Sequence, residues 1–118
     1  MTALHRAAFT LLAAASFAVQ AQSNMAFLKD APIQKMTRED TALLMKNSNE
    51  ALSRNADGET SAWTNPKTGA SGTATPLRSF TQKGMKCREA EYTNHAGGFN
   101  GGGRFTLCLR NGEWKIVS

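Results

Sequence analysis

The chain has 118 residues, a formal net charge of +5 at pH 7 and two cysteines, which suits one small domain. Nucleic-acid binding is disfavoured, because the basic residues are scattered and form no run or basic-aromatic array. A metal or other cofactor site is not expected either. His95 is the only histidine after residue 21, and two thiols with one histidine do not complete a zinc site.

Residues 1–21 are predicted to be a signal peptide. A short basic region precedes an apolar run over residues 7–19, and Val19-Gln20-Ala21 offers a signal-peptidase site. A buried internal helix is the alternative, but nothing around the run is amphipathic, and the run is too short to span a bilayer. We therefore expect an exported protein that starts near Gln22 and has no transmembrane span. Its positive charge suits an anionic envelope polymer or another envelope protein as partner.

Residues 22–36 are expected to form an extended lead-in to a domain over residues 37–118. A helix is predicted from Thr37 to near Asn55, because Thr37 is a good N-cap and Asp40 stands where a capping box needs an acceptor. The apolar stripe of this helix consists of Leu44, Met45, Ala51 and Leu52, with Ser48 among them. Such a helix can bind a partner, but we prefer the interpretation that it covers the protein's own sheet.

Two strands are predicted after the helix, over residues 59–64 and 70–80. The stretch between them, Asn65-Pro66-Lys67-Thr68-Gly69, has proline and glycine where a tight turn needs them. Gly72 and Pro76 indicate a bulge or an edge position in the second strand. Lys83-Gly84 is predicted to be the next turn.

The pair Asn111-Gly112 between alternating apolar residues predicts a two-residue β-hairpin. This turn places Leu109 opposite Trp114 and Leu107 opposite Ile116. The apolar face of the hairpin then carries Phe105, Leu107, Leu109, Trp114 and Ile116, and Cys108 points away from it. We expect this face to be the core that the helix covers.

Two cysteines in an exported chain most simply form one disulfide, here between Cys87 and Cys108. Pairing them across antiparallel strands places Glu91 opposite Arg104, an opposite-charge pair that supports this register. The connection over residues 93–103 is rich in glycine and is predicted to be a flexible hairpin loop. It does not suit phosphate binding, because a strand follows it instead of a helix.

Enzymatic activity is not expected. Glu89 and Glu91 share a strand face, so a glycosidase-like pair is conceivable, but neighbouring basic residues such as Arg104 favour keeping both ionised. A nucleophile would need His95 as its base, and both cysteines are used by the disulfide. Arg88 faces the apolar side and needs a carboxylate, carbonyls or an aromatic ring such as Trp63 or Trp114. We favour a structural role, in which it locks the core to the helix, over ligand binding.

Five residues remain as candidates for an interaction surface: Trp63, Arg88, His95, Phe99 and Arg104.

The order of motifs from Trp63 to Trp114 resembles the bacterial surface-antigen domain, named for a small rickettsial outer-membrane antigen. The matching pieces are Trp63-Thr-Asn-Pro-Lys-Thr-Gly, Cys87-Arg88, Leu107-Cys108 and Asn111-Gly112-Glu-Trp114. The resemblance implies an envelope location and no established chemistry. Many relatives are lipoproteins with a glycine-zipper segment. Since neither a lipidation cysteine nor a zipper is seen here, we expect a periplasmic form, which can still associate with the outer membrane.

These observations predict an α+β fold in which an N-terminal helix packs on a curved antiparallel sheet of four to five strands with one disulfide. The expected function is that of a non-enzymatic envelope protein with a structural or interaction role. An inhibitor or binding module for an envelope enzyme such as lysozyme, acting through the glycine-rich loop, is the alternative.

Overall fold

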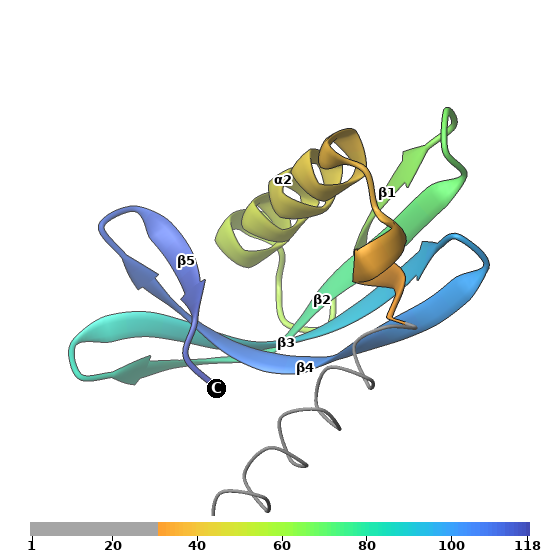
Figure 1. Ribbon diagram of the computed structural model, residues 1–118. Coiled ribbons are helices and arrows are strands. Elements are labelled where there is room, and N and C mark those ends of the chain that lie inside the picture. The colour runs from red at the N-terminus through yellow and green to blue at the C-terminus, as the bar shows by residue number, and fades with distance from the viewer. Residues whose placement is uncertain (1–30) are drawn as a thin grey trace, which may run out of the picture.

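The computed structural model describes residues 31–118 and forms a half-barrel of antiparallel strands around one α-helix (Figure 1). The helices are η1 (Pro32–Lys35) and α2 (Arg38–Arg54), and the strands are β1 (Ser61–Asn65), β2 (Ala70–Gln82), β3 (Met85–Ala96), β4 (Phe99–Arg110) and β5 (Glu113–Ile116). The strand order in the sheet is β1-β2-β3-β4-β5. The α+β fold predicted from the sequence is confirmed. The predicted signal peptide and the lead-in up to residue 30 lie outside the described residues.

The sequence predicted an extended lead-in up to residue 36, but its last part is not extended. Residues 32–35 form a 3₁₀-helix, with Pro32 at its start and Met36 returning to extended backbone. Proline fits the first turn of a helix because its missing N–H would have no partner there. This turn packs against β4, since a side chain on Gly101 would meet Pro32 at 2.8 Å.

The helix α2 begins with the predicted capping box. The Asp40 backbone N–H donates to Thr37 Oγ1, and the Thr37 N–H donates to the Asp40 carboxylate. The predicted apolar stripe is wrong at one position, because Met45 is 51% exposed. Asn47 is buried instead and donates to the carbonyl of Ser61. A buried amide satisfied by a strand carbonyl gives no apolar signal in the sequence.

The three hairpins that join β2 to β3, β3 to β4 and β4 to β5 each have a two-residue turn. Lys83 and Gly84, Gly97 and Gly98, and Asn111 and Gly112 all have positive φ, which is the type I′ geometry that suits the twist of paired strands. The turns at Lys83-Gly84 and Asn111-Gly112 were predicted. The flexible loop over residues 93–103 was a wrong prediction, because this stretch belongs to β3 and β4 and pairs continuously up to Ala96 and Phe99.

The predicted register of β3 and β4 is confirmed. Cys87 lies opposite Cys108 and forms a disulfide with it, and Glu91 lies opposite Arg104. Both cysteines face away from α2, yet each is only 1% exposed. In β2 the register shifts between Pro76 and Arg78, whereas Gly72 pairs regularly, so of the two predicted bulge positions only the one near Pro76 is correct.

The core between α2 and the concave face of the sheet consists of two small clusters. One contains Leu52, Ala90 and Leu107, with Tyr92, Phe105 and Trp114 packed against it. The other contains Trp63, Ala70 and Ala96, with Met36, Leu43 and Leu44 packed against it. Ile116 was predicted to belong to the core and does not, because it is 63% exposed. The helix ends before it reaches this end of the sheet, so β5 extends beyond the layer that covers the core.

Candidate binding cleft at the end of the helix

The concave face of the sheet is left uncovered beyond the C-terminal end of α2. The β2–β3 and β4–β5 hairpins both project past this end of the helix (Figure 1). Between them lies a cleft of about 550 Å³. Its lining residues come from the helix end and the two hairpins: Leu52, Ser53, Asn55, Ser79, Phe80, Thr81, Lys86, Cys87, Arg88, Leu109 and Trp114.

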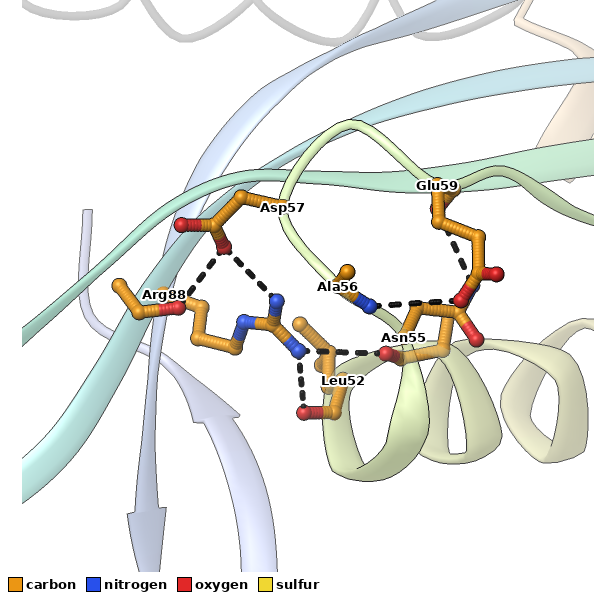
Figure 2. A network of polar contacts seen from close by, with 8 residues as sticks. Leu52, Asn55, Ala56, Asp57, Glu59 and Arg88 are labelled. Carbon is orange, nitrogen blue, oxygen red and sulfur yellow. Dashed lines mark hydrogen bonds and ion pairs between the residues drawn. The ribbon is translucent and has the colours of Figure 1, made fainter.

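Arg88 joins the floor of this cleft to the helix. Its Nη1 donates to the carbonyl oxygens of Leu52 at 2.8 Å and Ala51 at 3.3 Å, and its Nη2 donates to Asp57 Oδ1 at 2.8 Å (Figure 2). Both carbonyls belong to the last turn of α2, at the negative end of the helix dipole. The Ala51 carbonyl also accepts the Asn55 N–H, so the Leu52 carbonyl is the one that depends on Arg88. The guanidinium therefore caps the helix end from the neighbouring sheet.

Asp57 holds this guanidinium from the other side. Ser79 Oγ donates to the same carboxylate oxygen at 2.9 Å. The hydrogen bond from Arg88, and then the one from Ser79, hold the pKa of the Asp57 carboxyl below its ordinary value. The turn after α2 is consequently tied to both β2 and β3.

The lining of the cleft combines apolar surface with positive charge. Trp114 is half-buried, and its Nε1 donates to Ser53 Oγ at 3.1 Å, which fixes β5 against the helix end. Lys86 and Arg88 line the cleft, and none of the lining residues in the described part of the chain is acidic. Within residues 31–118, the buried Nε of Arg88 has no hydrogen-bond partner. An acceptor that reached this donor would be favoured, since an unpaired buried donor is costly. The cleft suits a group that has both an apolar part and a negative charge.

The two carboxylates weighed as a catalytic pair lie on the opposite, convex face of the sheet. Glu89 pairs with Arg78 and Glu91 pairs with Arg104, each at 3.0 Å. Among the described residues, no three His, Cys, Asp or Glu side chains are placed to hold a metal ion. None of the helices between residues 31 and 118 is long and apolar enough to cross a membrane.

The five candidate interaction residues do not gather in one site. Only Arg88 lines the cleft, and its partners are carbonyls and a carboxylate, as a core-locking arginine requires. Neither Trp63 nor Trp114 supplies a ring to it, and Trp63 belongs to the core. Phe99 lies 5.6 Å from Lys35 Nζ in a cation–π contact. Arg104 and His95 are exposed on the convex face, where Nδ1 of His95 lies 2.7 Å from Asn100 Oδ1.

A match to a known family covers the part of the chain that forms this cleft. The family model described as 17 kDa outer membrane surface antigen matches residues 50–115. The chain belongs to this surface-antigen family. It is also 32% identical over 85 residues to a 17 kDa surface antigen of Rickettsia bellii strain RML369-C and, equally, to one of Rickettsia bellii. The alignments cover 70% of this chain and 54% of each relative, so the chain spans about half the length of the curated relatives it matches. No solved structure matches.

Membership in the surface-antigen family indicates an exported protein of the cell envelope. The matched range contains every residue that lines the cleft, from Leu52 to Trp114. It excludes η1 and the first part of α2. The cleft is therefore built from the portion of the chain that defines the family.

Sequence reasoning missed two residues that shape the cleft of this surface-antigen protein. Asp57 was not among the candidate residues, although it follows a helix end and so stands near the carbonyls that need a cation. Lys86 was not singled out, although it lies two residues before Arg88 and therefore on the same strand face. The signal for both was available, but their positions at the cleft depend on the curvature of the sheet.

Proposed function

We propose that this protein is a non-enzymatic binding module on the periplasmic side of the envelope, able to associate with the outer membrane, and that the cleft is its binding site. The observation that carries this proposal is the uncovered end of the concave face. There Leu109 and Trp114 are only partly buried, and the charged side chains among the described residues that line the cleft are both basic. Exposed apolar surface rimmed by polar groups is typical of interaction sites.

The chemistry of the lining favours a segment of another envelope protein as the partner. A bulky apolar side chain would pack beside Trp114, and a carboxylate close to it would meet Lys86. An anionic envelope polymer would satisfy the charge but would leave the apolar half of the cleft without a contact. We therefore favour a protein segment over a polymer.

Non-enzymatic function is supported by the placement of the acidic residues. Each carboxylate of the conceivable pair already has an arginine partner on an exposed face, which lacks the water-excluded pocket that raises the pKa of a catalytic acid. The inhibitor alternative was based on a flexible loop over residues 93–103. That stretch is a tightly turned hairpin, so no observation favours this alternative.

Photo-crosslinking in the envelope tests the proposal. A photoreactive phenylalanine analogue at Leu109 should crosslink to one envelope protein, whereas the same analogue at Thr73 on the convex face should not. The variant Lys86→Glu should abolish the crosslink, and Lys46→Glu on the exposed side of α2 should preserve it. Equal crosslinking from both faces, or insensitivity to Lys86→Glu, would exclude the cleft as the site. Crosslinks to polysaccharide alone would favour the polymer.

A second measurement addresses enzymatic activity. The purified protein should release no soluble fragments from peptidoglycan. Release that disappears in Glu89→Gln or Glu91→Gln would overturn the non-enzymatic assignment.

A further inference from the structure

One edge of the sheet has backbone groups without partners over the glycine-rich part of β4. The strand β5 pairs only with residues 107–110 of β4, and the C-terminus adds contacts to Thr106. Residues 100–104 of β4 pair with β3 on one side only. This edge segment, residues 100–104, extends from the end of β5 toward the Gly97-Gly98 turn.

The direction of the free groups follows from the strand alternation. The Cα atoms of Cys87 and Cys108 are 4.0 Å apart, a spacing typical of an antiparallel pair that does not exchange hydrogen bonds. Thr106 accordingly directs its N–H and C=O toward the C-terminal residues Val117 and Ser118. Every second residue of β4 faces the same way, so Asn100, Gly102 and Arg104 direct their backbone groups away from β3. None of these groups has a partner within residues 31–118.

The other edge of the sheet is short. The strand β1 spans five residues, and by the same alternation Ser61, Trp63 and Asn65 direct their backbone groups toward β2. Only Ala62 and Thr64 face outward there, and a short edge strand is one way in which proteins blunt an edge against unwanted strand pairing. Residues 100–104 are therefore the longer open edge of the described sheet.

We propose that residues 100–104 are a self-association surface, on which a second copy of this chain pairs antiparallel about Gly102. In this register Gly102 faces Gly102 of the partner subunit, and Arg104 faces Asn100 of the partner subunit. No like charges are opposed. Each copy supplies three N–H and three C=O groups in the phase that this pairing requires, for about six intermolecular hydrogen bonds.

The glycines allow the two backbones to approach. The space beside Gly101 is occupied by Pro32 of the same copy, and the ring of Phe105 lies 3.5 Å from the position of a side chain on Gly103. The partner strand therefore meets no side chain at the centre of the contact, and the concave face above it is already filled.

The symmetry limits the assembly to two copies. The contact uses the same edge on both subunits, so pairing occupies that edge in both copies and the assembly closes as a dimer. A contact of five residues per subunit buries less surface than a standard stable interface. The dimer is therefore weak and concentration-dependent in solution.

Sedimentation equilibrium of the exported, disulfide-bonded chain measures the association. Asn100→Pro removes one outward N–H per subunit at a strand-edge position that tolerates proline. It should weaken dimerisation at least about tenfold. Asn100→Ala, which keeps the amide and loses the same contact to His95, should dimerise like the parent chain. A parent chain that sediments as a monomer throughout, or equal effects of both variants, would overturn the proposal.

Hydrogen exchange supplies a second readout that does not depend on the proline variant folding. The amides of Asn100, Gly102 and Arg104 should exchange more slowly as protein concentration rises, while the amide of Thr106 stays unchanged. Pro32, near the start of the described chain, packs against Gly101 close to this edge. Protection that is independent of concentration would mean that a segment of the same chain covers the edge, and it would overturn the dimer.

Discussion

The guanidinium of Arg88 and the carbonyl oxygen of Leu52 lie 2.8 Å apart, and this contact joins the middle of the sheet to the last turn of α2. Many helices end with a glycine in left-handed conformation that satisfies the final carbonyls. Here the C-cap is Asn55 in extended conformation, and an arginine from a strand supplies the donors instead. The helix end, which forms one wall of the cleft, is therefore fixed by a residue of the cleft floor.

Replacing Arg88 should destabilise the fold strongly. Arg88→Met keeps the apolar stem but takes the guanidinium donor away from the Leu52 carbonyl and the Asp57 carboxylate, and we expect a loss of about 2–4 kcal/mol in the free energy of unfolding. The matched control is Arg78→Met, since Arg78 pairs with Glu89 on an exposed face, where such pairs contribute less than about 1 kcal/mol. Urea denaturation of both variants makes the comparison. Losses of equal size would show that Arg88 does not lock the helix to the sheet.

The capping carboxylate Asp40 should make stability depend on pH in the acid range. Its burial pushes the pKa upward, but this effect is outweighed by donors around the carboxylate, and the pKa lies below the ordinary value of 3.8. The donors are the Thr37 N–H and the side chains of Asn65 and Thr68, the last two at 2.7 Å. A carboxyl whose pKa is lowered on folding stabilises the protein above its unfolded pKa, and this stabilisation is lost as pH falls through the folded value.

The variant Asp40→Asn tests this dependence, because an amide resembles the neutral acid. The parent chain should be more stable than Asp40→Asn at neutral pH, and the gap between their urea midpoints should close below about pH 4. A gap that stays constant down to about pH 2 would mean that the ionised form of Asp40 has no special stabilisation.

The disulfide register and two of the hairpin turns could be predicted because local residues determine them. Asn111-Gly112 suits positive φ at both turn positions, and one cysteine pair fixes the alignment of β3 with β4. The Gly97-Gly98 turn was missed because five glycines in the stretch hid it. Glycine is required at two of these positions by packing between distant parts of the chain. A side chain on Gly101 would meet Pro32, and one on Gly102 would meet the carbonyl of Tyr92. Glycine composition alone cannot separate close packing from flexibility.

The cleft could not be predicted, because it depends on where the helix ends relative to the sheet. Alternation placed Leu107, Trp114 and Ile116 on one face, and all three were expected in the core. Only Leu107 is buried there, because α2 stops at Arg54 and the sheet continues past it. The apolar residues beyond the helix end line the cleft or are exposed, and no local pattern distinguishes them from core residues.

Removal of the disulfide should cost a large part of the stability. Cys87 and Cys108 are 21 positions apart, and closing such a loop restricts the unfolded chain by about 3 kcal/mol. The double variant Cys87→Ala/Cys108→Ala should therefore unfold at a lower urea concentration than the parent. Thiol titration of the unfolded, unreduced parent is the control and should find no free thiol in the described chain. An unchanged free energy of unfolding would show that packing alone holds β3 to β4.

Two glycines of the sheet should respond oppositely to the same substitution. A Cβ on Gly72 would lie 2.6 Å from Trp63 Nε1 and 2.7 Å from the carbonyl oxygen of Thr93, whereas the nearest atoms to a Cβ on Gly103 are at 3.5 Å, an ordinary contact. Gly72→Ala should therefore destabilise the protein by about 1–3 kcal/mol, because the indole and a strand carbonyl must both move. Gly103→Ala should be neutral or slightly stabilising, since alanine reduces the freedom of the unfolded chain. Urea midpoints measure both, and Trp63 fluorescence should shift only in the first variant. A tolerated Gly72→Ala would mean that the second core cluster adapts more readily than its close packing indicates.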